Sequence, residues 1–117
     1  MSGIAGVLKF NQTEVNESLL QKMSEPIKKR GPDGTSIFRR KNMGFVHTKL
    51  AAVSNGQEPY YDEKFGIAVT TNGTIYNQDA LREELEGLGY QFYTESQAEV
   101  LAKSYHCWGD LFVERLD

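Results

Sequence analysis

Short turn sequences divide this chain into brief segments, and that division limits what it can fold into. Turn-forming residues stand at positions 30–34 (RGPDG), 41–42, 72–73 (NG) and 89. No apolar run approaches the roughly 18–20 residues of a membrane-spanning helix. The N-terminus also lacks the basic-then-apolar pattern of a signal peptide. With 117 residues, we expect one domain over residues 1–117, located in the cytoplasm.

The apolar pattern between the turns predicts an α+β fold, because strands gather early in the sequence and helices late. Apolar residues recur at helical spacing in the first segment that we interpret as a helix, and leucines do so in the second. The predicted strands are residues 3–10, 35–40, 43–52 and 65–71, and the predicted helices are 16–29, 78–88 and 97–105. Residues 41–42 are expected to close a hairpin, residues 54–59 a loop, and residues 90–93 a short extended stretch.

Several residues indicate where the helices begin and end. Pro26 is expected to kink or end the first helix early. Asn77 is expected to cap the second helix, and Gly89 to stop it. Ser96 and Glu99 have the spacing of a capping box for the third helix.

Charge is divided unevenly along the chain. Residues 1–50 hold nine Lys or Arg against four Asp or Glu, and residues 51–117 hold four against twelve. The basic residues fall in two short clusters, 28–30 and 39–41, without interleaved aromatic residues. The first cluster suits the negative end of a helix dipole. Nucleic-acid binding is therefore not favoured.

Cys107 is the single cysteine of the chain. It excludes an internal disulfide, and one cysteine with two histidines does not favour a zinc site. No metal and no cofactor are predicted.

Five motifs occur in order along the chain and together resemble one family. They are residues 3–7 (GIAGV), 30–34 (RGPDG), 47–50 (HTKL), 72–77 (NGTIYN) and 94–100 (TESQAEV). The series resembles the glutaminase domain of asparagine synthetases, a class II glutamine amidotransferase. The resemblance implies an N-terminal-nucleophile fold, a layered α/β/β/α sandwich.

The resemblance also implies a chemistry. In the family, removal of the initiator methionine makes a cysteine the first residue, and its own α-amine acts as the base. An arginine binds the glutamine carboxylate with two parallel hydrogen bonds, and an aspartate binds its ammonium. The released ammonia then reaches an ATP-using synthetase domain.

This chain departs from the family at three of these positions. Ser2 stands where the family has the nucleophilic cysteine. Lys49 stands in place of the arginine and lacks its planar fork. Gln97 stands in place of the aspartate and carries no charge. Glu95 would point to the same side as Gln97 if the segment is extended, and is a candidate for the missing carboxylate.

The oxyanion element is retained. Asn72 offers a side-chain N–H and Gly73 a backbone N–H at a turn. The resemblance therefore implies that Asn72 and Gly73 stabilise the oxyanion, with Ser2 as the nucleophile and Lys49, Gln97 and Glu95 as substrate-binding residues. We interpret His47 as a packed strand residue.

The family domain continues beyond the segment that resembles residues 108–117. We therefore expect a partial or truncated sandwich with exposed strand edges, which favour pairing with another chain. The expected partner is a second copy of the chain or a synthetase-type protein.

Two main functions remain open. One is a catalytically degenerate amidotransferase-like domain used for binding, regulation or self-association, with glutamine or another small amide as a ligand. The other is an active glutaminase or amidohydrolase with Ser2 as the nucleophile, which would supply ammonia to an ATP-dependent synthetase. A nucleic-acid or general interaction module on the same fold is a third.

Overall fold

The computed structural model describes residues 2–9, 13–49 and 58–117. These residues form two compact units. The first unit contains the described residues up to position 49 together with Thr70–Gly73, and the second contains residues 58–69 and 74–117. Each unit is described by itself. The single domain expected over residues 1–117 stays a prediction.

The first unit is built on a three-stranded antiparallel sheet in the order β1-β3-β2. Its strands are β1 (Gly3–Leu8), β2 (Gly34–Arg40) and β3 (Met43–Lys49). The turn between β2 and β3 is the one predicted at residues 41–42, and Lys41 there has a φ of 54°. Residues 10 and 50–52 of the predicted strands lie outside the described residues.

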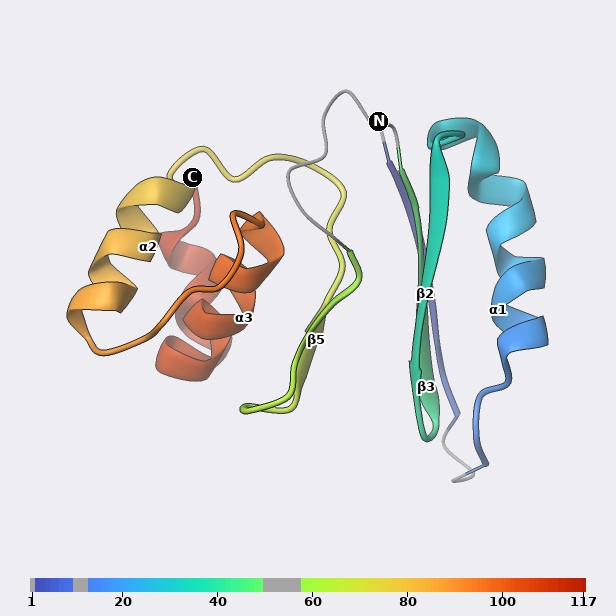
Figure 1. Cartoon of the computed structure of the whole chain (residues 1–117), viewed down its shortest axis with the longest axis horizontal. Coiled ribbons are helices and arrows are strands. Elements are labelled where there is room, and N and C mark those ends of the chain that lie inside the picture. The colour runs from blue at the N-terminus through green and yellow to red at the C-terminus, as the bar shows by residue number, and fades with distance from the viewer. Residues whose placement is uncertain (1, 10–12, 50–57) are drawn as a thin grey trace. The chain divides into compact units, whose positions relative to one another are not determined.

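A helical segment lies along one face of this sheet (Figure 1). It consists of α1 (Glu17–Ser24) followed by a 3-10 helix, η1 (Glu25–Arg30). Pro26 stands in the first turn of η1, so the prediction that it ends the α-helix early is confirmed. Between α1 and the sheet lie the fully buried side chains of Val15, Leu20 and Val46.

The second unit combines a small antiparallel sheet with helices. Strands β4 (Tyr60–Asp62) and β5 (Ile67–Val69) pair with each other. They are followed by α2 (Gln78–Gly87), α3 (Gln97–Trp108) and a 3-10 helix, η3 (Gly109–Arg115). Leu81 and Leu85 of α2 pack with Val100 of α3 in a buried cluster.

The element types agree with the predicted α+β class, but several boundaries differ. The sequence analysis missed β4, because three residues after a proline carry no alternating apolar pattern. The strand predicted over residues 65–71 is shorter, and the last helix extends to Trp108 rather than to position 105. Residues 54–57 of the predicted loop lie outside the described part of the chain, and residues 90–93 carry no regular secondary structure.

The structure corrects the predicted cap at Asn77 and one half of the capping box predicted at Ser96 and Glu99. Asn77 occupies the position before α2, but its side chain makes no capping bond. It instead donates to the Arg115 carbonyl and accepts from the Asp117 N–H. Ser96 does cap α3 by accepting from the Ala98 N–H. The Glu99 half of the capping box is absent, since that carboxylate binds Tyr93 and Thr94.

Candidate functional site

Ser2 precedes β1 at one end of the three-stranded sheet. It is half-buried, and its carbonyl accepts a hydrogen bond of 3.3 Å from the Arg30 Nε–H. Among the described residues its hydroxyl makes no hydrogen bond. The first residue of the 30–34 turn thus contacts the residue at the expected nucleophile position.

The 30–34 turn is also fitted against the end of β3. A Cβ on Gly31 would collide with backbone atoms of Thr48 and Lys49, so this position has no room for a side chain. The Asp33 N–H donates to the Lys49 carbonyl at 2.9 Å. The turn therefore fixes the backbone of Lys49, the expected carboxylate-binding position.

Strand pairing brings Ser2 and Lys49 to the same end of the sheet. The register pairs Gly3 with Thr48, so Ser2 and Lys49 are the next residues along their strands. Thr48, the residue before Lys49, is fully buried against β1 and η1, where its hydroxyl accepts from the Gly3 N–H and donates to the Ile27 carbonyl. The sequence analysis gave Thr48 no role, although it lies inside one of the five motifs.

Asn72 and Gly73 belong to the same unit. Just before them, Thr70 Oγ1 lies 3.0 Å from Nδ1 of His47 on β3. His47 is only 5% exposed, which agrees with its interpretation as a packed strand residue. Four of the motifs thus contribute residues to the first unit.

The Asn72-Gly73 turn is open to solvent. Both residues are exposed, and the Asn72 side chain makes no hydrogen bond within the described part of the chain. Gly73 has a φ of 143° and empty space where a Cβ would stand. Glycine is therefore required here by backbone conformation rather than by crowding. The oxyanion role of the two residues stays a prediction.

Gln97 and Glu95 lie in the second unit. Gln97 is the first residue of α3, and its Oε1 accepts a hydrogen bond of 3.0 Å from the Ile75 N–H. Glu95 is exposed and outside the helix. Because Gln97 is helical, the extended segment that would place both side chains on one side is not formed.

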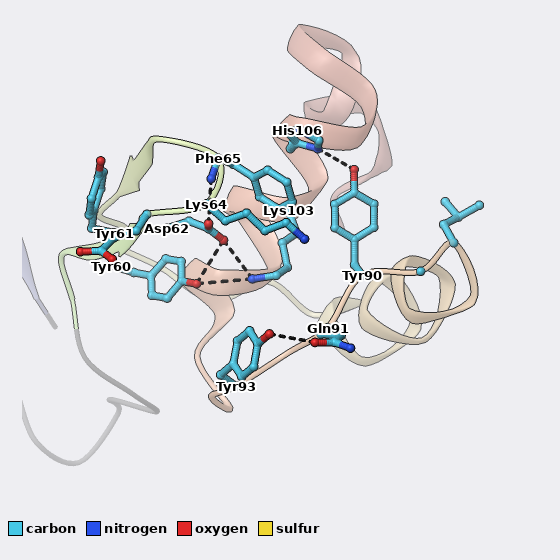
Figure 2. A pocket seen from close by; sticks show the side chains of 13 residues that line it. Tyr60, Tyr61, Asp62, Lys64, Phe65, Tyr90, Gln91, Tyr93, Lys103 and His106 are labelled. Carbon is cyan, nitrogen blue, oxygen red and sulfur yellow. Dashed lines mark hydrogen bonds and ion pairs between the residues drawn. The ribbon is translucent and has the colours of Figure 1, made fainter.

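A buried ion cluster in the second unit was not predicted as a cluster. It consists of Asp62, Glu99 and Lys103, whose side chains are 6%, 0% and 4% exposed. Lys103 Nζ lies 3.0 Å from Asp62 Oδ2 and 2.9 Å from Glu99 Oε2, and Figure 2 shows its interactions with Tyr60 and Asp62. The spacing of Glu99 and Lys103 along one helix face was a signal for their pair. Asp62 comes from a strand far away in sequence, so no local pattern could reveal it.

Hydrogen bonds keep all three members of the cluster charged. Burial raises the pKa of Asp62, but hydrogen bonds from Lys103 and from the Phe65 N–H outweigh it, so the pKa lies below the usual value. The pKa of Glu99 is lowered in the same way, by Thr94, Lys103 and the Tyr93 N–H against the effect of burial. Burial lowers the pKa of Lys103, but its hydrogen bonds to Glu99 and Asp62 have the larger, opposite effect. The pKa of Lys103 therefore lies above its usual value.

A pocket of about 790 Å³ opens beside this cluster. Aromatic side chains line much of it, among them Phe65, which stacks on His106 with ring centroids 3.8 Å apart. The Tyr90 hydroxyl is 2.7 Å from His106 Nδ1. Two buried polar groups of its lining, Lys103 and Asp62, are paired with each other and thereby link α3 to β4. No group of three His, Cys, Asp or Glu residues within the described ranges could hold a metal ion.

The chain matches known proteins over its full length. Residues 1–117 match the family described as "Glutamine amidotransferase domain". The chain is 38% identical over 120 residues to asparagine synthetase (glutamine-hydrolyzing) 3 of Arabidopsis thaliana, covering 100% of this chain and 20% of that protein. It is 41% identical over 112 residues to asparagine synthetase (glutamine-hydrolyzing) 1 of Bacillus subtilis (strain 168), covering 90% of this chain and 17% of that protein.

The shared region is a small part of each relative. A probable asparagine synthetase (glutamine-hydrolyzing) of Dictyostelium discoideum is 37% identical over 123 residues, with 100% of this chain and 22% of that protein covered. The chain thus spans about a fifth of the length of the curated relatives that it matches. Within residues 2–9, 13–49 and 58–117, no helix has the length and apolar character needed to cross a membrane.

Proposed function

Because this chain belongs to the family of glutamine amidotransferase domains, with asparagine synthetases as its relatives, we propose that it is a degenerate amidotransferase domain. In this proposal it binds a small amide or a protein partner and does not hydrolyse glutamine. It acts as a binding, regulatory or self-associating module in the cytoplasm and needs no cofactor.

The observation that carries the proposal is the hydrogen bond between Gln97 and Ile75. The family resemblance places the ammonium-binding carboxylate at position 97. The residue there is neutral, and its oxygen already accepts the Ile75 N–H at 3.0 Å. Glu95 is exposed outside the helix and is not aligned with Gln97. The charge that favours an amino-acid ammonium is therefore missing from this position.

Two further positions support the same function. Serine at position 2 is a weak nucleophile, because its hydroxyl stays protonated at neutral pH. Lys49 keeps a positive charge but cannot form the two parallel bonds of an arginine with a carboxylate. The backbone at both positions is nevertheless held in place. Arg30 donates to the Ser2 carbonyl, Gly31 packs against the backbone of Lys49, and Thr48 accepts from the N–H that follows Ser2. This combination suits retained ligand binding without efficient turnover.

One observation favours the alternative, an active amidohydrolase. The Ser2 hydroxyl makes no hydrogen bond among the described residues, and the exposed side chain of Asn72 makes none there either. After removal of Met1, the Ser2 oxygen would attack the amide carbon while the free α-amine takes its proton. That proton would pass to the departing nitrogen, which leaves as ammonia. Water would then hydrolyse the seryl ester.

Ammonia release from L-glutamine separates the two functions. Intact mass first establishes whether Met1 is removed from the preparation. We expect no release by the wild type and measurable release by a Ser2→Cys, Lys49→Arg, Gln97→Glu triple variant. Robust wild-type release that disappears in Ser2→Ala would overturn the proposal and support the alternative.

Self-association has its own support and its own test. The outer strands β1 and β2, and each strand of the β4–β5 pair, have one edge without a strand partner among the described residues. Open edges favour pairing with another chain. We expect a dimer or larger assembly in sedimentation velocity at micromolar concentration, and a stable monomer without a partner would contradict this part of the proposal.

A further inference from the structure

All the described residues that line the pocket of about 790 Å³ belong to the second unit, and its volume suits a small organic ligand. Figure 2 shows Tyr60 and Phe65 at the pocket on the β4–β5 hairpin, and Tyr90 and Tyr93 on the segment between α2 and α3. The described lining includes none of the residues at the nucleophile, carboxylate-binding and ammonium-binding positions. The pocket is thus not the glutamine site that the resemblance implies.

Aromatic faces at this pocket already hold positive charge. Lys103 Nζ lies 5.7 Å from the ring centroid of Tyr60 and 5.8 Å from that of Tyr93. The exposed Lys64 likewise places its Nζ 5.3 Å from the ring centroid of Phe65. A ring face attracts a cation that lies within about 6 Å of its centroid. The rings of the pocket are therefore suited to stabilise a cation.

The buried ammonium of Lys103 is fully used by the protein. Its three N–H donors meet three oxygens, which belong to Asp62 at 3.0 Å, Glu99 at 2.9 Å and Tyr60 at 3.4 Å. An anionic ligand would have to displace one of these oxygens to reach the ammonium. The pocket therefore does not favour an anion.

The charges at the pocket leave a negative excess. Its lining holds Asp62 and Glu63 against Lys64 and Lys103. Glu99, which bonds Lys103 and is fully buried, adds a third carboxylate. Because buried charges are screened much less than exposed ones, this excess attracts a positively charged ligand. The segment 51–117 is acidic in the same sense, with four Lys or Arg against twelve Asp or Glu.

Two tyrosine hydroxyls of the pocket are paired with neighbouring side chains. Tyr93 donates to Gln91 Oε1 at 2.8 Å, and the Tyr90 hydroxyl lies 2.7 Å from His106 Nδ1. A primary ammonium brings three N–H donors that need acceptors when they are buried. A fully methylated ammonium brings none and is stabilised by ring faces alone. The pocket therefore favours the methylated group.

We propose that this pocket binds a small organic cation, a methylated ammonium on an apolar body, with its charged group against the rings of Tyr60 and Tyr93. The proposal does not rest on the proposed function, because the pocket uses other residues and the ligand undergoes no reaction.

Choline and its neutral analogue, in which a tert-butyl group replaces the trimethylammonium group, separate charge from shape. Each is titrated into the full chain at about pH 8, where a free histidine side chain is uncharged, and the backbone amide signals are followed by NMR. We expect choline to shift the signals of Lys64, Gly89 and Gln91, which line the pocket. It should bind at least about fivefold more tightly than the analogue, the factor for one cation–π contact.

Substitution of Tyr93 tests the ring contact. Tyr93 is 78% exposed, so its replacement should leave the fold intact. Tyr93→Leu should weaken choline binding by about fivefold, and Tyr93→Phe should retain the wild-type affinity because it keeps the ring. Tyr76→Leu is the matched control, since Tyr76 is 83% exposed and is not part of the described lining.

Lys64 gives a second, independent test. Its ammonium competes with the ligand for the pocket, so Lys64→Gln should tighten choline binding by about fivefold and leave the binding of the neutral analogue unchanged. Lys22→Gln, at an exposed position of α1 in the first unit, is the control for the loss of one positive charge.

Equal affinities of choline and its neutral analogue would overturn the inference, as would the absence of shifts at the lining amides of the folded wild type. Should Tyr93→Leu fail to fold, Lys64→Gln decides, and an unchanged affinity for choline in that variant would overturn the inference. Because neither probe contains an amide, these outcomes are independent of the ammonia measurement.

Discussion

Lys103 lies one helical turn after Glu99 on α3, and its ammonium is 2.9 Å from the Glu99 carboxylate while both side chains are almost fully buried. The same ammonium is 3.0 Å from Asp62 on β4. Glu99 in turn binds the segment before α3 through Thr94. One lysine thus links β4 to α3. Its partner Glu99 links the same cluster to the segment that precedes α3.

Lys103→Met should strongly destabilise the second unit. Removing the lysine leaves two carboxylates buried without their counter-charge, which costs about 3–5 kcal/mol in comparable sites. The free energy of unfolding, measured by urea titration, checks this. Lys28→Met is the matched control, because Lys28 pairs with Glu25 in an exposed pair of the kind worth about 0–1 kcal/mol. Equal losses in the two variants would contradict the expectation.

The ion cluster should also make stability depend on pH in the acid range. The pKa values of Asp62 and Glu99 are lowered in the folded state. Their contribution is therefore present above the unfolded values of about 3.9 and 4.3 and is lost as pH falls through the lower folded values. The pKa of Lys103 is raised, so its contribution is complete below about pH 10.4 and is lost as pH rises through the folded value.

Urea midpoints between pH 7 and pH 2.5 measure this dependence. We expect the wild type to lose more stability on acidification than Asp62→Asn, which has no carboxylate to protonate at that position. Asp79→Asn, on the exposed surface of α2, should follow the wild type. Parallel curves for the wild type and Asp62→Asn would show that Asp62 adds nothing to the acid sensitivity.

Gly31→Ala should destabilise the first unit, because the new methyl group meets the backbone of Thr48 and Lys49. Overpacking of this kind costs about 1–3 kcal/mol. Gly87→Ala is the control, since Gly87 lies at the end of α2 with open space around it, and alanine favours a helix over glycine by up to about 1 kcal/mol. Thermal unfolding should therefore shift down in the first variant and not in the second.

Asn77→Ala should release the C-terminal residues without unfolding α2. The Asn77 side chain bonds Arg115 and Asp117 but does not cap the helix. Hydrogen exchange at Asp117 should become faster while exchange at Leu85 stays unchanged. Equal loss of protection at both amides would mean that Asn77 stabilises the helix itself.

Local features of this fold could be predicted because the interacting residues are close in sequence. Pro26 ends α1 within its own turn, Ser96 caps α3 two residues away, and the 41–42 turn joins neighbouring strands. The five motifs were sufficient to predict the family, and the full-length match confirms it.

The sequence by itself determined the turns, the α+β class and the family, because each depends on residue type and on short spacing. Only the tertiary structure decided the partners of Glu99, Asn77 and Gln97. Their hydrogen-bonding groups have many possible partners in sequence, and packing decides which of these come within reach. Asp62 meets Lys103 across 41 residues, and Ile75 meets Gln97 across 22. Such pairs form only when strands and helices have already been brought together by burial of their apolar faces.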